Sequence, residues 1–475
     1  MTNEWETVVG LEVHAELATK TKLFSGAPNQ FGDEPNTNID PVSLGLPGSL
    51  PVLNEQAVEL AIRLGLALNC EIRPSVFARK NYFYPDMPKD FQISQYDKPI
   101  DADGHLDLPS GKRVGVERAH LEEDTGKSTH VGGGGRIHGA DYSLVDYNRA
   151  GVPLLEIVSR PDLRGADDAR EYVAELRAIL VATGVSDGKM EEGSMRVDAN
   201  VSVRPLGSDT LGTRCEIKNL NSLRSLGRAI EHEAQRQIEL ITAGERVRQE
   251  TRHWSEATGT TSTMRSKEDA DDYRYFTEPD LVPLEPSAEW IEEIRAGLPV
   301  LPAERRTRLA AAAGVALPHE GVALIVAREQ DDQALGAMAA GADPARVLVH
   351  VEQNLSGEAG ATLAADRLAA LVALETGGAL TATQAKTVLL EMLGSAETPE
   401  AIAAAHGYEA MDSGALEGTV ADVIEAHPVE WEQFRTGDDK ARGKLTGFFV
   451  GQVMRATNGQ ADGKAVTALL RSRAE

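Results

Sequence analysis

The stretch from Val9 to Leu17 constrains the fold most, because apolar and polar residues alternate along it. Val9, Leu11, Val13, Ala15 and Leu17 fall on one side of the alternation, and Glu12, His14 and Glu16 fall on the other. Side chains of a β-strand point alternately to its two faces and recur about every 7 Å along each face. The stretch therefore predicts a strand with one face on a core. Its other face, of carboxylates and an imidazole, is either solvated or part of a site.

Further segments repeat this pattern. Arg196, Asp198, Asn200 and Ser202 alternate with alanine and valine, Glu216 and Lys218 flank Ile217, Glu123 shares a face with Ala119 and Leu121, and Glu156 shares one with Leu154 and Val158. A single acid in a strand is usually solvated. Several strands that each place acids among apolar residues favour a concave sheet lined with carboxylates and cations, although a purely structural polar sheet is the alternative.

Such a sheet suits magnesium-nucleotide chemistry. Mg²⁺ prefers oxygen ligands and is typically held by one or two carboxylates together with substrate phosphates. Arg and Lys side chains on the same sheet would neutralise a phosphoryl group in transfer. The sequence has no Gly-x-Ser-x-Gly nucleophile motif and no reactive-cysteine signature, which disfavours hydrolysis by a side-chain nucleophile.

Composition bounds the class of protein. The 475 residues suffice for two to four domains, and the only cysteines, Cys70 and Cys215, suit a reducing cytosol and exclude a four-cysteine zinc site. The net charge of −26 is spread along the chain, and such a charge either repels nucleic acid or keeps a protein soluble in concentrated salt. The polar N-terminus and the lack of an 18-residue apolar run predict a cytoplasmic protein with no membrane span.

The chain changes character near residue 290. Strand patterns and nearly all aromatic residues precede this point, with amphipathic helices expected over residues 54–68, 166–183 and 221–243. A proline-rich boundary follows, and the alanine-rich remainder predicts helices over residues 306–313, 344–354 and 361–375. Residues 436–475 carry seven Lys or Arg against four Asp or Glu. This end is therefore either a module that approaches phosphates or a solvated helix surface.

Two segments concentrate aromatic side chains. Residues 79–92 read RKNYFYPDMPKDFQ, and residues 271–276 read DDYRYF. Aromatic rings among Lys, Arg and Asn suit stacking on a nucleobase, with the cations placed for phosphates. Ordered loops that pack on the core are an equally good interpretation.

Seven motifs in order resemble those of one family, the B subunit of the aspartyl/glutamyl-tRNA amidotransferase. They are GLEVHAEL from Gly10, RKNYFYPDMPKDFQISQYDKP from Arg79, HLEEDTGKS from His120, VDYNRAGVPLLEIVS from Val145, EEGSMRVDANVSVR from Glu191, CEIKNLNS from Cys215 and DYRYFTEPDLVPL from Asp272. The resemblance covers essentially the whole chain. It implies an α+β fold, with a catalytic cradle domain (residues 1–292) built on antiparallel sheet and distantly similar to glutamine synthetase. A helical domain (293–405) and a helical tail domain that binds tRNA (406–475) would follow.

The resemblance also implies a reaction and partners. ATP phosphorylates the side-chain carboxylate of Glu or Asp misacylated on tRNA-Gln or tRNA-Asn, and ammonia then displaces the phosphate. An amidase-type glutaminase would supply the ammonia, and a small third polypeptide would bridge the two in a heterotrimer.

Similarity to the family suggests the site residues. Mg²⁺ would be held by His14, Glu123 and Glu156. Glu12, Asp198 and Glu216 are the catalytic candidates beside it, and Lys80, Arg196 and Lys218 are the candidates for contacts with the phosphates of ATP.

One stretch departs from the family. Many relatives carry four cysteines for zinc after Lys22, where this chain has Ser25, Ala27, Asp40 and Ser43. These side chains cannot form a tetrahedral thiolate site. We therefore expect no structural zinc, and we expect packing around Phe24, Phe31 and Pro41 to hold that corner.

Two alternatives remain. The related archaeal amidotransferase protein, an E subunit, acts on Glu-tRNA alone and typically carries a large inserted domain, whereas this chain runs from Pro283 straight into helical sequence. A non-catalytic, tRNA-binding scaffold protein is the second alternative, and a phosphorylated intermediate would exclude it.

Overall fold

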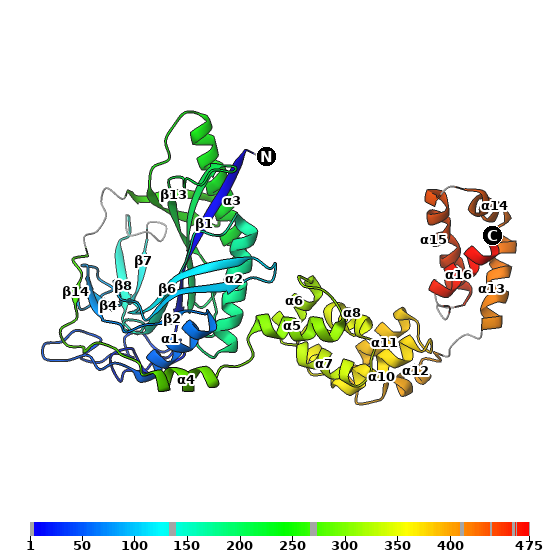
Figure 1. The fold of residues 1–475 in the computed structure, drawn as a ribbon, viewed down its shortest axis with the longest axis horizontal. Coiled ribbons are helices and arrows are strands. Elements are labelled where there is room, and N and C mark those ends of the chain that lie inside the picture. Colours follow the sequence, from blue (N-terminus) through cyan, green and yellow to red (C-terminus); the bar gives the residue numbers. More distant parts are fainter. Residues whose placement is uncertain are drawn as a thin grey trace. The chain divides into compact units, whose positions relative to one another are not determined.

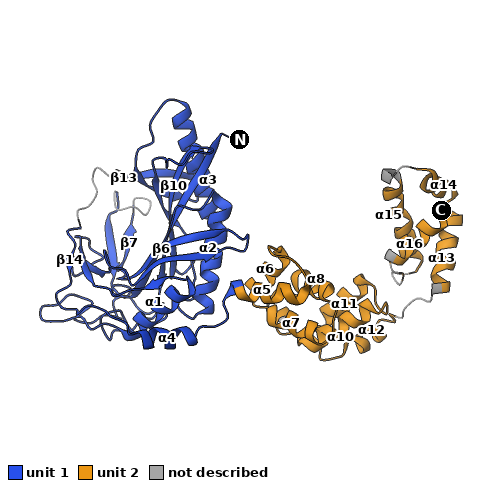
Figure 2. Cartoon of the chain, in the orientation of Figure 1, with its two compact units in different colours: residues 1–303 blue, residues 304–475 orange. Residues whose placement is uncertain are grey.

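The computed structural model describes residues 4–132, 139–266, 273–408, 413–437, 439–457, 461 and 463–474. Asp271 and Asp272, which open the second aromatic segment, lie outside the described residues. The chain forms two compact units, residues 1–303 and residues 304–475 (Figure 2).

A large, mostly antiparallel sheet forms the centre of the first unit (Figure 1). Its strands in the described part of the chain are β1 (Trp5–Glu16), β2 (Glu71–Ile72), β3 (Ala78–Asn81), β4 (Phe91–Ser94), β5 (Asp101–Asp107), β6 (Arg113–Glu123), β9 (Pro153–Ser159), β10 (Met195–Pro205), β11 (Cys215–Leu220), β12 (Glu250–Ser255), β13 (Thr260–Ser266) and β14 (Phe276–Thr277). Their order is β13-β12-β11-β10-β1-β9-β6-β4-β3-β14, with β5 beside β6 and β2 beside β5. Strands β7 (Lys127–Val131) and β8 (Tyr142–Asp146) form a separate hairpin.

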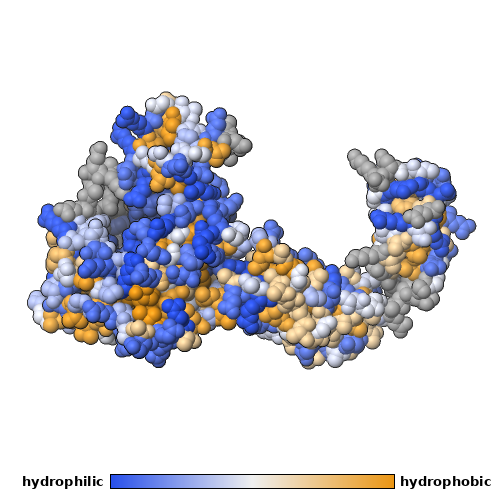
Figure 3. Space-filling model, in the orientation of Figure 1, coloured by the Kyte–Doolittle hydropathy of each residue, from blue (hydrophilic) through white to orange (hydrophobic). Residues whose placement is uncertain are grey.

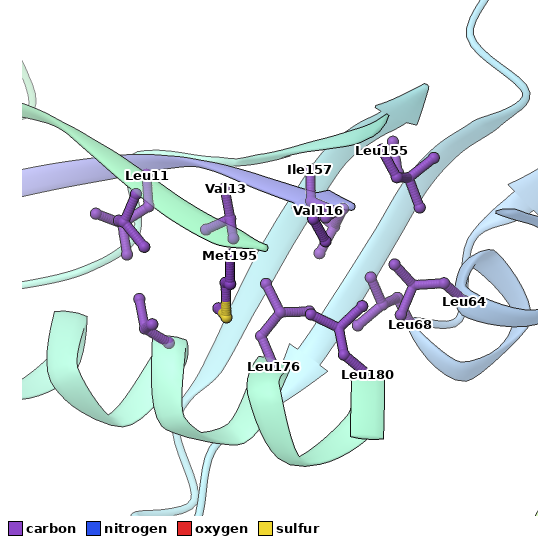
Figure 4. Close-up of a cluster of buried hydrophobic side chains, with 14 of the residues drawn as sticks. Leu11, Val13, Leu64, Leu68, Val116, Leu155, Ile157, Leu176, Leu180 and Met195 are labelled. Atoms are coloured by element: carbon purple, nitrogen blue, oxygen red, sulfur yellow. The ribbon is translucent and has the colours of Figure 1, made fainter. Parts of the chain in front are cut away.

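The predicted alternation of β1 is confirmed, and it sorts the two faces of the sheet. Leu11 and Val13 are buried, whereas Glu12 and His14 are half-buried on the opposite face. The apolar face packs on α1 (Glu55–Ala67), α2 (Ala166–Ala182) and α3 (Leu223–Thr242). Figure 4 shows Leu176 of α2 among the apolar side chains of β1, β6, β9 and β10. The polar face is thereby left free to form a site.

The three helices predicted for this unit are confirmed, with ends set by local signals. The side chain of Asn54 accepts hydrogen bonds from two backbone N–H groups at the start of α1, and the side chain of Ser222 accepts one, from the Ser225 N–H, at the start of α3. Gly184 and Gly244 follow α2 and α3 with positive φ angles of 68° and 78°, a conformation that favours glycine. A short helix, α4 (Ala288–Ala296), completes the unit.

In the described residues of the second unit, all the secondary-structure elements are helices joined by turns. Its helices are α5 (Pro302–Ala313), α6 (Glu320–Ala327), α7 (Asp331–Ala339), α8 (Pro344–Asn354), α9 (Glu358–Ala361), α10 (Ala365–Thr376), α11 (Ala382–Met392), α12 (Pro399–Ala405), α13 (Ser413–Ala426), α14 (Pro428–Thr436), α15 (Asp439–Ala456) and α16 (Gly463–Ala474). One buried apolar cluster spans residues 309–403 and another spans 416–470. The helix predicted over 361–375 begins later, because α9 ends at Ala361 and a new helix starts at Ala365. The α+β fold class is confirmed, whereas the predicted domain boundaries stay predictions.

The corner without cysteines is held by hydrogen bonds and by one aromatic ring. Ser43 N–H donates to Asp40 Oδ1 at 2.8 Å, and Asp40 N–H donates to Ser43 Oγ at 2.9 Å. Phe24 is buried edge-to-face on Phe77. Phe31 is 75% exposed, so the prediction that it packs in this corner is wrong.

Hydrophilic residues cover much of the face of the first unit seen in Figure 3, with apolar residues gathered toward its lower end. Among the described residues, no helix has both the length and the apolar character that a bilayer crossing requires.

Candidate functional site

The polar face collects side chains from seven adjacent strands, β11, β10, β1, β9, β6, β4 and β3. Glu12 of β1 pairs with Asp198 of β10. His14 pairs with Glu156 of β9, and His120 of β6 pairs with the same Glu156. Cross-strand partners on one face have Cβ atoms about 5 Å apart, so the register of the sheet gathers these groups.

His14 lies at the centre of the acid cluster, which comprises Glu12, His14, Glu156 and Asp198. Its Nε2 atom lies 3.4 Å from Glu156 Oε2 and 3.6 Å from Glu12 Oε1. Burial and the charge of Glu156 raise the pKa of Glu12 to about 7. Burial disfavours a protonated imidazole, but the hydrogen bond and charge of Glu156 outweigh it and raise the pKa of His14. Despite burial, His120 and His14 hold the pKa of Glu156 below its usual value. Glu12 is therefore the acid of the cluster whose charged form a bound cation would favour.

Two sets of side chains on this face could hold a divalent cation. The first is Glu12, His14 and Asp198, and the second, which is fully buried, is His120, Glu122 and Glu156. Within each set, one ligand atom per residue lies within 4.8 Å of the others. Carboxylate oxygens with one imidazole nitrogen fit a divalent cation. The Nδ1 atom of His120 has no hydrogen-bond partner among the described residues, and its Nε2 atom lies 3.8 Å from Glu156 Oε2 and 4.0 Å from Glu122 Oε2.

Basic side chains stand beside the acids and are paired with them. Arg196 donates to Asp124 Oδ2 at 2.6 Å. Lys218 Nζ lies 2.6 Å from Asp198 Oδ2 and 2.9 Å from Glu216 Oε1. Burial opposes the charge of Lys218, but these two acids outweigh it and raise the pKa of its ammonium group. The face therefore keeps its cations charged, as the binding of phosphate requires.

Glu122 is held by two side chains from neighbouring strands. Gln92 of β4 donates to Glu122 Oε1 at 3.0 Å, and Lys80 Nζ of β3 lies 3.4 Å from the same atom. Burial opposes the charge of Lys80, but Glu122 outweighs it and raises the pKa of the ammonium group. Lys80 is thus a charged group at the edge of the second ligand set.

Glu123 lies on the other face of β6, away from His14 and Glu156. It is buried against Lys89, whose Nζ donates to Glu123 Oε1 at 2.6 Å, and its Oε2 accepts a 3.0 Å hydrogen bond from the Ile93 N–H. Successive residues of a strand point to opposite faces, so Glu122 and Glu123 cannot both reach the acid cluster. The structure therefore brings Glu122, and not the predicted Glu123, into the group with Glu156.

A cavity of about 410 Å³ opens along this face. Its lining includes His14, Glu122, Arg196, Asp198 and Lys218. The volume is in the range usual for small-molecule and cofactor sites.

Eight of the nine residues predicted for the site lie on this face; Glu123 is the exception. Sequence reasoning missed His120, Glu122, Asp124 and Gln92. The alternation of His120, Glu122 and Asp124 in the motif HLEED was a signal that could have found three of them. Gln92 carried no such signal, because only the pairing of β4 with β6 brings it to Glu122.

Grouped acids for a divalent cation, next to charged lysine and arginine side chains, are suited to the handling of nucleotide phosphates. The comparisons with known proteins identify the family. The model described as GatB/GatE catalytic domain matches residues 7–292, and the model described as GatB domain matches residues 346–473.

Relatives match over nearly the whole chain. The B subunit of the aspartyl/glutamyl-tRNA(Asn/Gln) amidotransferase of Thermosynechococcus vestitus is 48% identical, over 98% of this chain and 96% of its own length. The B subunits of Kineococcus radiotolerans and Rhodococcus jostii are 49% and 50% identical, over 99% and 98% of this chain and 97% and 96% of their own lengths. The chain therefore belongs to this family of B subunits of a tRNA amidotransferase, a ligase, as predicted.

Proposed function

We propose that the polar face binds ATP with Mg²⁺ and phosphorylates the side-chain carboxylate of Glu or Asp carried by a misacylated tRNA-Gln or tRNA-Asn. The carboxylate oxygen attacks the γ-phosphorus and the bond to ADP breaks. Ammonia then attacks the acyl carbon, loses a proton and releases phosphate, which leaves the amide. The observation that carries this proposal is the acid cluster, in which burial and the charge of Glu156 raise the pKa of Glu12 to about 7.

The two ligand sets would hold the metal, with Glu122 in the place predicted for Glu123. When bound, Mg²⁺ neutralises the phosphate charge that develops during transfer. In the first set, Glu12 of β1 and Asp198 of β10 would supply carboxylate oxygens to the metal. Glu216 would keep Lys218 in place through its 2.9 Å contact. Neither ligand set needs a residue from outside the sheet.

Three basic residues would receive the phosphates. Lys80, Arg196 and Lys218 each pair with an acid at 3.4 Å or less. A phosphate would offer these cations a second anionic partner. The three residues come from β3, β10 and β11, so they would clamp a substrate from both sides of the acid cluster.

The ammonia would come from a partner. Cys70 and Cys215 are buried free thiols, and burial raises the pKa of Cys215 to about 12, which leaves it unreactive. We therefore propose an amidase-type glutaminase and a small bridging polypeptide as the partners of this chain, in a cytoplasmic heterotrimer. The relatives over nearly the full length are B subunits, which favours this assignment over the archaeal E subunit.

The helical tail, predicted as residues 406–475, would bind the tRNA. Its last forty residues carry seven Lys or Arg against four Asp or Glu, within a chain whose net charge is −26. Basic side chains on a small helical module supply the phosphate contacts that position a nucleic acid.

An oxygen-transfer experiment tests the central step. Glu-tRNA-Gln labelled with ¹⁸O in the side-chain carboxylate is incubated with the complex, ATP and glutamine, and the released phosphate is analysed by mass spectrometry. An acyl phosphate intermediate places one ¹⁸O atom in the phosphate. Unlabelled phosphate, with amidation intact, would contradict the proposal and leave this chain the role of a scaffold.

A further inference from the structure

Four tyrosines meet beside the polar face, at the β3–β14 edge of the sheet. We call them the tyrosine cluster: Tyr82, Tyr96, Tyr273 and Tyr275. Tyr96 and Tyr275 are stacked, with ring centroids 3.8 Å apart and planes within 9° of each other. Tyr273 lies edge-to-face on Tyr275 at 6.0 Å and on Tyr82 at 6.3 Å. The cluster unites the two aromatic segments of the sequence.

The backbone around the cluster is fixed. Asn81 N–H donates to the Tyr273 carbonyl at 3.0 Å, and the Asn81 side chain donates to the Arg274 carbonyl at 2.9 Å. Arg274 has a φ of +46°, a conformation that L residues rarely adopt. Backbone held in such a region commonly marks a functional position. The rings are therefore presented by a clamped segment.

One lysine joins the cluster to the acids. The Nζ atom of Lys80 lies 5.4 Å from the centroid of the Tyr273 ring and 3.4 Å from Glu122 Oε1. Burial raises the pKa of Tyr275 to about 12, and the charges of Lys80 and Glu122 act on its hydroxyl in opposite directions. A single side chain, Lys80, therefore lies between the tyrosine cluster and Glu122 of the second ligand set.

Packing alone does not account for these rings. Tyr96 is 57% exposed, although it stacks fully on Tyr275. A tyrosine that serves a core is buried, as Tyr172 is in this chain. An exposed ring that is already stacked, in a cluster whose Tyr273 ring contacts Lys80, matches the platforms on which proteins stack bases.

We infer that the tyrosine cluster is a stacking platform for an adenine base. The inference rests on the proposed function, because both of its substrates carry adenine: ATP, and the 3′-terminal adenosine of the tRNA next to the esterified amino acid. The exposed surface of Tyr96 supplies affinity that a chain of net charge −26 does not obtain from long-range electrostatics. Lys80 lies where the phosphate or ribose side of the same nucleotide would meet the acids.

Substitutions that remove or keep the ring test the platform in the complete amidotransferase complex. Tyr96→Leu removes the exposed ring and Tyr275→Leu removes the ring on which it stacks, whereas Tyr96→Phe and Tyr275→Phe keep both rings. Tyr142→Leu on β8 is the matched control, because Tyr142 is also 57% exposed. We expect each leucine variant to raise the KM for one substrate about tenfold, and the phenylalanine and control variants to stay within about twofold.

The two sources of adenine give different results. An effect on the KM for ATP, with weaker preference for ATP over GTP, assigns the platform to ATP. An effect on the KM for Glu-tRNA assigns it to the terminal adenosine. Unchanged KM values for both substrates in folded leucine variants would overturn the inference. A wild-type complex that forms no amide at all would instead overturn the proposed function.

A fluorescence measurement avoids the risk that a variant does not fold. The wild-type complex is mixed with 2-aminopurine riboside triphosphate, and separately with tRNA that carries 2-aminopurine at its 3′ end. Stacking quenches 2-aminopurine, so we expect quenching with one of the two probes. Bright fluorescence with both, at concentrations where each probe is bound, would overturn the inference.

Discussion

Glu156 and Glu233 are both buried glutamates of the first unit, yet their surroundings differ. Glu233 of α3 accepts hydrogen bonds from Arg236 at 2.6 and 2.9 Å and from Gln237 at 2.8 Å, and Arg252 lies 3.4 Å away. Burial opposes its ionisation, but Arg236 and Gln237 outweigh it and hold the pKa of Glu233 below its usual value. Glu156 instead has imidazoles at 3.4 and 3.8 Å and Arg118 at 3.6 Å.

The difference separates a structural network from a site. Guanidinium groups at hydrogen-bond distance neutralise Glu233 completely, so this group needs nothing from solution. The acid cluster has longer contacts and an acid, Glu12, whose pKa is raised to about 7. A fold can tolerate such a group when a cation from solution completes it. Charge balance, more than burial, thus distinguishes the two.

The largest expected effect is on stability at the neutralised acid. Glu233→Gln leaves Arg236 and Arg252 without their carboxylate, so we expect the free energy of unfolding to fall by about 3–5 kcal/mol. Despite burial, His120 and His14 also hold the pKa of Glu156 below its usual value. These contacts are longer, so we expect Glu156→Gln to lower the free energy of unfolding by less. Urea unfolding of both variants measures this. Equal losses in the two variants would contradict the distinction between a structural network at Glu233 and a site at Glu156.

Neighbouring acids of β6 allow a tighter comparison. Glu123→Gln leaves the buried Lys89 unpaired, so we expect a loss of about 3 kcal/mol in the free energy of unfolding. Glu122→Gln should keep the fold and lower ATP-dependent amidation at least about tenfold, which is about 1.4 kcal/mol of transition-state stabilisation. Urea unfolding and amidation assays on both variants show which acid supports the fold and which supports catalysis. If Glu123→Gln stays stable but loses its metal dependence, the ligand suggested by the resemblance is the correct one.

Asp101 shows a third way to bury an acid, and it predicts a pH dependence. Its side chain is fully buried, neither oxygen has a hydrogen-bond partner among the described residues, and burial raises the pKa of Asp101 well above the usual value. The folded state therefore binds a proton that the unfolded state loses near pH 4. As the pH rises from there toward the folded pKa, the unfolded state binds fewer protons and stability falls by up to about 1.4 kcal/mol per pH unit.

Asp101→Asn removes this dependence, because an amide does not titrate. The variant should gain stability over the wild type as the pH rises from 5 to 8. Urea unfolding at several pH values measures the gain. Parallel curves for the two proteins would mean that Asp101 is ionised or partnered in the folded state.

The sequence predicted the faces of the sheet better than the site. Alternation along Val9–Leu17 placed Glu12 and His14 correctly opposite a core, since the pattern is local to one strand. Alternation alone could not choose between Glu122 and Glu123, because two adjacent acids place one residue on each face of the strand. Only the bulge in β6 between Val116 and Arg118 and the pairing of His120 with Glu156 decide which face joins the cluster.

The ion pairs between strands could not be predicted from the sequence either. Lys80 and Lys218 were predicted from the resemblance, but their partners Glu122 and Asp198 follow from the strand order. The buried Asp101 gave no signal, because an acid in a strand is usually solvated. The predicted helices of the first unit were confirmed because Asn54, Gly184 and Gly244 are local signals that mark where the helices begin or end.

Binding of Mn²⁺, followed by its electron paramagnetic resonance signal, tests most directly whether the acid cluster is completed by a cation. We predict that the purified complex removes free Mn²⁺ from solution at about 0.15 M salt, and that Glu156→Gln weakens this binding at least about tenfold. Asp167→Asn, at a carboxylate that is 99% exposed on α2, should bind as the wild type does. Equal binding by all three proteins would contradict the account, because the cluster would then be neutral without a metal.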